Sequence, residues 1–218
     1  MVILRYDLME KVLFEKIIVI IRGVERKYLR ELCEALYAGG IRFVEYTYNF
    51  FSDSETAKSI EYMNDFFSDK MFIGAGTVLN AEQVRLTKKA GGKFIISPDF
   101  NRNVVEETKK HGLLSMPAAM TSTEINEAYK TGADIVKLFP AAVLGADYLR
   151  AVTAPLKNVP IMAVGGINTD NIPGFLAAGA KAFGIGSDIV RKDMIESADY
   201  DGISRIAQKF VSVVNEEE

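Results

Sequence analysis

Eight short apolar runs recur along the chain, and stretches with helical spacing separate them. Most of the runs are continuously apolar rather than alternating, which is typical of parallel strands covered on both faces. Between the first two runs, Leu29, Leu32, Cys33 and Leu36 form one apolar helical stripe. The pattern therefore predicts eight alternating strand and helix units. The apolar runs are residues 17–21, 43–47, 71–75, 94–97, 113–116, 135–139, 161–164 and 182–185.

Helix starts are marked by a capping residue followed three positions later by an acid or an amide. The pairs are Ser52 with Glu55, Asn80 with Gln83, Asn103 with Glu106, and Thr121 with Glu124. Eight evenly spaced units in 218 residues predict one α/β domain over 1–218, a (β/α)₈ TIM barrel. A helix over 6–14 is expected to cover its bottom. A doubly wound sheet is the alternative, but the repeat shows no central break.

Composition narrows the class of protein. The net charge of −3 and the 49% hydrophobic content give no basic excess for nucleic acid or for an anionic membrane, and no apolar run near the N-terminus is long enough to span a bilayer. A single cysteine fits a reducing compartment, so we expect a cytoplasmic protein. Cys33 itself fits core packing. The one histidine, His111, cannot form a metal site or a catalytic triad alone and is expected near a helix end.

Lys137 is the most informative residue, because it lies well inside the apolar run 135–139. A buried ammonium without a countercharge tends to lose its proton. A lysine that is neutral near pH 7 is a nucleophile. Other lysines near the predicted strands, such as Lys93 and Lys181, stand just before their runs, where solvent is expected.

Glu45 is the only carboxylate embedded in a predicted strand. Since Glu45 and Lys137 both lie toward the C-terminal ends of their strands, they are expected to meet at the mouth of the barrel, where such barrels place their catalytic groups. The pair suggests imine chemistry with a nearby proton carrier. A buried ion pair that only braces the interior is the structural alternative.

Glycine-rich segments end the seventh and eighth runs, at 163–168 and 183–188. Exposed backbone N–H groups at these two strand ends can bind a phosphate, and tight turns without a ligand are the alternative. Neither segment is a dinucleotide-binding motif. Arg22 ends the first run and is a candidate for binding a substrate carboxylate, with a surface salt bridge as the alternative.

Seven short segments, taken together in their order and spacing, are specific. They are Arg22-Gly23, Val44-Glu45, Gly74-Ala75-Gly76-Thr77-Val78, Ile96-Ser97-Pro98, Lys137-Leu138-Phe139-Pro140, Gly165-Gly166-Ile167 and Gly186-Ser187. With these segments the sequence resembles a known family over nearly its whole length: the class I aldolases of 2-keto-3-deoxy-6-phosphogluconate and 2-keto-3-deoxy-6-phosphogalactonate.

The resemblance implies that Lys137 forms the Schiff base and that Glu45 is the general acid and base. It also implies a homotrimer, with Thr77, Pro98 and Phe139 at the pyruvate end of a keto-acid phosphate substrate. The phosphate is then held by Gly165, Gly166, Gly186 and Ser187. No metal and no organic cofactor is needed, because the iminium accepts the electrons. Cleavage would give pyruvate and glyceraldehyde 3-phosphate, or pyruvate and glyoxylate from 4-hydroxy-2-oxoglutarate.

Three departures leave the sugar open. The gluconate-specific pattern has arginine at Asn49, glutamate at Ala142 and threonine at Val164. Asn49 and Val164 are more similar to the galactonate version. Ala118 also replaces a glycine that is usual in both versions, which is expected to narrow the pocket. Two other functions remain as alternatives: a phosphate-binding barrel epimerase or synthase that uses Glu45 as base, and a sugar-acid-phosphate sensor without turnover.

Overall fold

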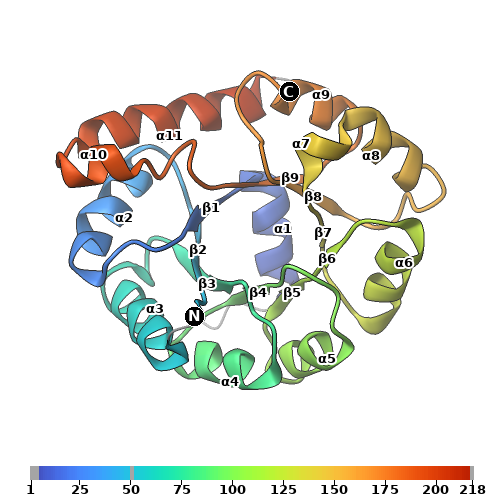
Figure 1. Ribbon diagram of the computed structural model, residues 1–218, viewed down its shortest axis with the longest axis horizontal. Helices are drawn as coiled ribbons and strands as arrows, with labels where there is room; N and C mark the ends of the chain where they lie inside the picture. Colours follow the sequence, from blue (N-terminus) through green and yellow to red (C-terminus); the bar gives the residue numbers. More distant parts are fainter. Residues whose placement is uncertain (1–4, 50–51, 217–218) are drawn as a thin grey trace.

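The computed structural model describes residues 5–49 and 52–216. Its strands form one parallel sheet in the order β5-β4-β3-β2-β1-β9-β8-β7-β6. Figure 1 shows these strands at the centre with helices around them. The strands are β1 (Ile17–Ile21), β2 (Phe43–Thr47), β3 (Phe72–Gly76), β4 (Phe94–Ile96), β5 (Leu114–Met116), β6 (Ala118–Ala119), β7 (Val136–Leu138), β8 (Ile161–Val164) and β9 (Ala182–Ile185).

The sheet curves into a nearly closed barrel, which confirms the predicted fold. β1 pairs in parallel with both β2 and β9, so the first and last strands are neighbours. In a doubly wound sheet the last strand lies at an edge and not beside the first, so this alternative is wrong. The two outer strands of the order, β5 and β6, are consecutive in the chain and are separated only by Pro117.

The predicted fifth strand is thus two short strands rather than one. β5 pairs with β4, whereas β6 pairs with β7. Pro117 has no N–H to donate, but its carbonyl oxygen accepts a hydrogen bond from the Lys137 N–H at 2.9 Å. The segment around Pro117 therefore changes partner from one neighbouring strand to the other.

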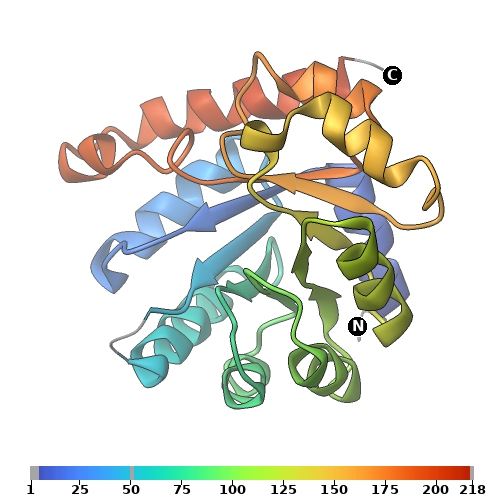
Figure 2. The same ribbon diagram turned by 45° about the vertical axis from the view of Figure 1, so that its right-hand side comes forward.

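Apart from α1, which lies inside the ring in Figure 1, the helices form an outer layer around the strands (Figures 1 and 2). The helices are α1 (Arg5–Glu15), α2 (Leu29–Ala38), α3 (Asp53–Phe67), α4 (Ala81–Lys89), α5 (Arg102–Lys110), α6 (Ser122–Thr131), α7 (Ala141–Leu144), α8 (Ala146–Thr153), α9 (Ile172–Ala177), α10 (Lys192–Glu196) and α11 (Tyr200–Asn215), with a 3₁₀ turn η1 (Arg26–Tyr28) before α2. The long hydrophobic cluster between sheet and helices includes Cys33, whose burial raises the pKa of its thiol to about 12.

A second apolar cluster fills the inside of the barrel. It contains Phe43, Phe94, Met116 and Met162, which come from four different strands. α1 covers the N-terminal ends of the strands, as predicted, because Leu8 and Val12 belong to the same cluster. Arg5 in this helix also pairs with Asp134, just before β7. The bottom of the barrel is closed, which leaves the C-terminal ends of the strands for a site.

Three of the four predicted helix caps are confirmed. The side chains of Ser52, Asn80 and Thr121 each accept a hydrogen bond from the N–H three residues later. The fourth prediction is wrong, because Asn101 rather than Asn103 caps α5 and accepts the Asn103 N–H at 3.0 Å. An asparagine two residues earlier offers the same cap, so the helix begins sooner.

One smaller prediction, for His111, is also confirmed by the structure. His111 is the C-cap residue of α5, and its Nε2 lies 3.1 Å from Glu107 Oε1, as expected for a residue at a helix end. Within residues 5–49 and 52–216, no helix is both long enough and apolar enough to cross a membrane.

Candidate active site

Lys137 lies in the middle of β7, paired in register with Ala118 of β6 and Met162 of β8. Its side chain is only 7% exposed. Burial lowers the pKa of its ammonium; the Glu45 carboxylate opposes this shift and the Arg22 charge adds to it. Nζ lies 5.1 Å from the centre of the Phe139 ring. The sequence prediction that Lys137 is buried is confirmed.

Glu45 lies on β2, in register with Gly74 of β3, and is 1% exposed. Burial raises the pKa of its carboxyl group to about 7, against the opposing charges of Lys137 and Arg22. Oε2 accepts no hydrogen bond from any residue in the described part of the chain. A carboxyl group with this pKa can exchange a proton near neutral pH.

The ion-pair alternative receives no support from these contacts. Lys137 and Glu45 are close enough to shift each other's pKa. Within the described ranges, however, no salt bridge joins them, and Glu45 Oε2 stays without a partner. A pair that braced the interior would need such hydrogen bonds to offset the cost of burying both charges.

A cavity of about 350 Å³ opens above Lys137 at the C-terminal ends of the strands. All the predicted site residues except Glu45 line it, and Glu45 is buried away from its surface. The predicted residues in the lining are Arg22, Thr77, Pro98, Lys137, Phe139, Gly165, Gly166, Gly186 and Ser187. Five further residues line the cavity, which are Ile20, Val164, Ile167, Gly184 and Asp188. Ile20 was missed by the sequence analysis, whereas the other four belong to the two glycine-rich segments 163–168 and 183–188.

Arg22 and Thr77 meet on one wall of this cavity. Arg22 Nη2 donates to Thr77 Oγ1 at 3.3 Å. Thr77 has a φ of 57°, in the left-handed region that a β-branched residue rarely adopts. Thr77 directly follows Gly76, and its conformation places its hydroxyl beside the Arg22 guanidinium. Such strained residues concentrate at functional sites.

The two glycine turns form another part of the lining. Gly165 has a φ of 95°, and a Cβ there would lie 3.0 Å from the Phe139 ring. Gly166 has a φ of 72°, and a Cβ there would lie 2.7 Å from Ala142 Cβ. The N–H groups of Gly166 and Ser187 donate no hydrogen bond to another described residue. These amides are free for an anion.

Gly76 provides the space that Glu45 occupies. A Cβ at Gly76 would lie 2.3 Å from Glu45 Oε1. Gly76→Ala should therefore displace the carboxylate and lower kcat on the order of 10-fold to 100-fold, because small misplacements of catalytic groups are costly. Circular dichroism should show an intact fold. Gly174→Ala, with open space around its Cβ, is the control, and equal activities for both variants would contradict the prediction.

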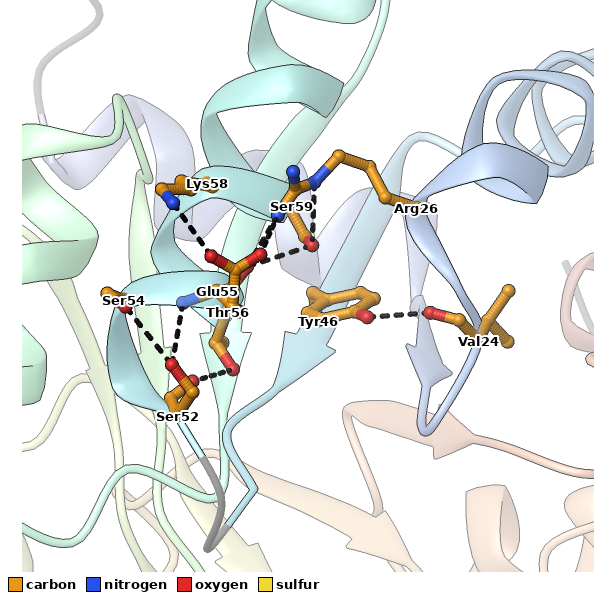
Figure 3. A network of polar contacts seen from close by, with 9 residues as sticks. All are labelled: Val24, Arg26, Tyr46, Ser52, Ser54, Glu55, Thr56, Lys58 and Ser59. Carbon is orange, nitrogen blue, oxygen red and sulfur yellow. Dashed lines mark hydrogen bonds and ion pairs between the residues drawn. The ribbon is translucent and has the colours of Figure 1, made fainter.

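The loop that carries Arg22 is held from outside the barrel (Figure 3). Tyr46 Oη donates to the carbonyl oxygen of Val24 at 2.6 Å. Arg26 Nη2 donates to Glu55 Oε2 at 2.8 Å, and its Nε reaches Ser59 Oγ at 3.4 Å. These contacts tie the segment after β1 to β2 and α3. On β2, Glu45 points inward while its neighbour Tyr46 fixes the loop.

Tyr46→Phe should raise KM about 3-fold to 10-fold with a smaller change in kcat, because the loop that presents Arg22 loses its anchor. Thermal unfolding should show that the free energy of unfolding falls by an amount on the order of 1 kcal/mol. The matched control is Tyr48→Phe, whose buried hydroxyl bonds to Gln83 O and Thr87 Oγ1 instead. If Tyr48→Phe raised KM equally, the higher KM of Tyr46→Phe would reflect a general loss of rigidity and not the loss of this loop anchor.

Comparison with known proteins agrees with this geometry. The family model described as KDPG and KHG aldolase matches residues 8–206. The chain belongs to this aldolase family. A 2-dehydro-3-deoxy-6-phosphogalactonate aldolase of Escherichia coli (strain K12) is 32% identical over 80% of this chain and 84% of its own length.

Two solved structures share the fold closely. One, described as a native KDPGal structure, is 30% identical with a TM-score of 0.84, over 92% of this chain and 94% of its own. The other is KDPG aldolase from Legionella pneumophila, with pyruvate captured as a covalent carbinolamine intermediate. It is 30% identical with a TM-score of 0.80, over 88% of this chain and 92% of its own.

Proposed function

We propose that this protein is a class I aldolase that cleaves a 2-keto-3-deoxy-6-phospho sugar acid to pyruvate and glyceraldehyde 3-phosphate. The observation that carries the proposal is Lys137, a buried lysine with a lowered pKa that reaches the cavity, beside an unpaired buried carboxyl group at Glu45. The pyruvate adduct of the Legionella pneumophila relative supports the same chemistry.

In the proposed reaction, the neutral Lys137 amine attacks the C2 carbonyl of the keto acid. The carbinolamine loses water and becomes an iminium, which withdraws electrons from C3. Glu45, as carboxylate, takes the proton of the C4 hydroxyl through a water molecule while the C3–C4 bond breaks. Glyceraldehyde 3-phosphate leaves, the enamine is protonated at C3, and water hydrolyses the iminium to release pyruvate.

Arg22 has two roles in this proposal. It lines the cavity with Lys137 and can bind the substrate carboxylate. Its charge also lowers the pKa of both Lys137 and Glu45. A lower pKa favours the neutral amine at Lys137 and the ionised carboxylate at Glu45, which are the forms that the first and second steps need.

The other lining residues divide between the two ends of the substrate. Thr77, Pro98 and Phe139 surround the pyruvate end, near Lys137. The free amides at the two glycine turns, with the Ser187 hydroxyl, bind the phosphate. Asp188, the next residue after Ser187, also lines the cavity, and its negative charge would disfavour a phosphate placed too close.

The enzyme is further proposed to be cytoplasmic, as its cysteine content suggests, and to be a homotrimer, as the family resemblance implies. Exposed apolar side chains support a subunit contact, since Val143 is 82% exposed and Met120 is 42% exposed. Sedimentation of the purified protein at several concentrations would measure the assembly. The epimerase or synthase alternative is not favoured, because the family and the pyruvate adduct both point to aldol chemistry.

A turnover screen tests the proposed function directly. Pyruvate release is followed for the phosphogluconate-type substrate, the phosphogalactonate-type substrate and 4-hydroxy-2-oxoglutarate. At least one of the two phosphorylated substrates should be cleaved. Every substrate that is cleaved should give one pyruvate per molecule. Binding of all three without pyruvate release would support a sensor instead.

Asn49 is expected to influence which sugar acid is used. It follows β2 at the mouth of the barrel, but its side chain does not line the cavity, and its Oδ1 accepts the Ser52 N–H at 3.1 Å. A longer arginine could reach the substrate. In Asn49→Arg, kcat/KM should move toward the gluconate type, whereas the native enzyme should use the galactonate type at least comparably. A native preference for gluconate that this variant leaves unchanged would contradict the prediction.

A further inference from the structure

A buried amide holds the segment that follows Thr77. Gln83 is the third residue of α4 and is 6% exposed. Its Oε1 accepts the Leu79 N–H at 2.7 Å, and its Nε2 donates to Oδ1 of Asp53, the first residue of α3, at 2.9 Å. A backbone N–H can only donate and an ionised carboxylate can only accept, so these partners allow one orientation of the amide. Gln83 thus joins the segment after β3 to the start of α3.

The bond to Leu79 holds a segment whose backbone is strained. Thr77 has a φ of 57°, in a region that a β-branched residue adopts only where its surroundings fix it. Beyond Thr77, the Val78 N–H donates to the carbonyl oxygen of Ile96 at 3.2 Å, and the Leu79 N–H donates to Gln83. Only the second of these two hydrogen bonds uses a side chain, so a single substitution can remove it without changing a strand.

The cap of α4 does not account for this contact. In a capping box, the side chain at the third helical position would accept the N–H of the N-cap residue. The N-cap residue is Asn80, whose Oδ1 accepts the Gln83 N–H at 3.0 Å. The Gln83 side chain reaches one residue further back, to Leu79. The helix is therefore capped by Asn80, and the Gln83 amide holds the segment before the helix.

We infer that Gln83 is a positioning residue for the pyruvate end of the substrate. Through the Leu79 N–H it holds Thr77, which lines the cavity and whose Oγ1 accepts from Arg22 Nη2 at 3.3 Å. Asp53 in turn fixes the amide in the orientation that this contact needs. Gln83 does not line the cavity itself, so it acts on the substrate only through Thr77. The inference rests on the proposed function.

Exchange of the pyruvate C3 protons, followed by NMR, reports on this end of the site alone. Gln83→Met keeps most of the side-chain volume but cannot accept the Leu79 N–H. The half-saturating pyruvate concentration should rise about 5-fold, as expected for the loss of one hydrogen bond. Borohydride at saturating pyruvate should still label Lys137. In a Thr77→Val background, Gln83→Met should raise this concentration less than about 2-fold further, because the hydroxyl that it positions is already absent.

An exchange of polar groups tests the contact itself. Gln83→Glu combined with Asp53→Asn reverses the donor and the acceptor of this pair and leaves a carboxylate oxygen to accept the Leu79 N–H. The double variant should return the half-saturating pyruvate concentration to within about 2-fold of the native value. Asn80→Ala is the control for helix stability, because it removes the cap of the same helix. It should lower Tm but leave the exchange reaction unchanged.

Three results would overturn the inference while leaving the aldolase intact. They are an unchanged half-saturating concentration in folded Gln83→Met, an equal increase with and without the Thr77 hydroxyl, and a double variant as impaired as Gln83→Met. An equal increase in Asn80→Ala would also overturn it, since loss of helix stability would then be sufficient. If pyruvate gives neither proton exchange nor a borohydride label at Lys137 in the native enzyme, the proposed function itself fails.

Discussion

Lys137→Met is expected to lose aldolase activity by a factor on the order of 10⁴ or more, since removing a catalytic nucleophile is among the most costly single changes to an enzyme. Methionine keeps most of the side-chain volume in the buried position, so the fold should survive. Borohydride with pyruvate should add one reduced pyruvyl group to the native chain at Lys137 and none to the variant. Mass spectrometry of the peptides locates the label.

The matched control is Lys181→Met. Lys181 stands just before β9, where its N–H bonds to Ile161 O, at the opposite end of the strands from the cavity. The Lys181→Met variant should keep native activity, and pyruvate with borohydride should label it at Lys137 as in the native chain. A label on a lysine other than Lys137, or full turnover by Lys137→Met, would exclude the Schiff-base mechanism.

The sequence was sufficient to predict the barrel because its signals are local. Each strand is a short apolar run, and the helix caps at Ser52, Asn80 and Thr121 follow from the side chains of neighbouring residues. Lys137 and Glu45 could be found for the same reason, since a charged residue inside an apolar run is visible without a structure. Arg22 and the glycine-rich segments were found at strand ends in the same way, whereas the roles of Thr77, Pro98 and Phe139 were supplied by the resemblance to the aldolase family.

What the sequence did not predict depends on contacts between distant segments. The space for Glu45 exists because Gly76 of the next strand has no side chain, and nothing near Glu45 in the sequence signals this. Likewise, the anchoring of the Arg22 loop by Tyr46 joins residues from two strands. The split at Pro117 reflects a change of partner between β4 and β7, which local propensity cannot show.

A second cavity, of about 500 Å³ and lined in part by Arg22, Arg191 and Lys192, was missed for a related reason. Arg191 and Lys192 follow the β9 turn as ordinary surface residues in the sequence. The barrel closes by pairing β1 with β9. This pairing places Arg191 and Lys192 beside Arg22, which follows β1. Charges that lie far apart in the chain thus form one lining.

The stability of Glu45→Gln distinguishes a catalytic role from a bracing role. Burial raises the pKa of this carboxyl group from 4.5 to about 7, so the folded protein binds its proton more tightly than the unfolded chain does. Ionisation therefore opposes folding as the pH rises from about 4.5 through 7. Relative to the native protein, Glu45→Gln should gain thermal stability between pH 5 and pH 8. A variant that is clearly less stable at pH 8 would favour the ion-pair role.

Glu45→Gln should still form the pyruvate imine but cleave substrate about 10²-fold to 10⁴-fold more slowly, because the amide cannot accept the C4 hydroxyl proton. Exchange of the pyruvate C3 protons with deuterated water should slow by a similar factor, which NMR can follow. In the native enzyme, activity should fall as the pH drops below about 7, where the carboxylate becomes protonated. The variant should lose this part of the pH profile, while borohydride trapping at Lys137 should keep its own dependence on pH. If the folded variant cleaves at the native rate, Glu45 does not carry the proton.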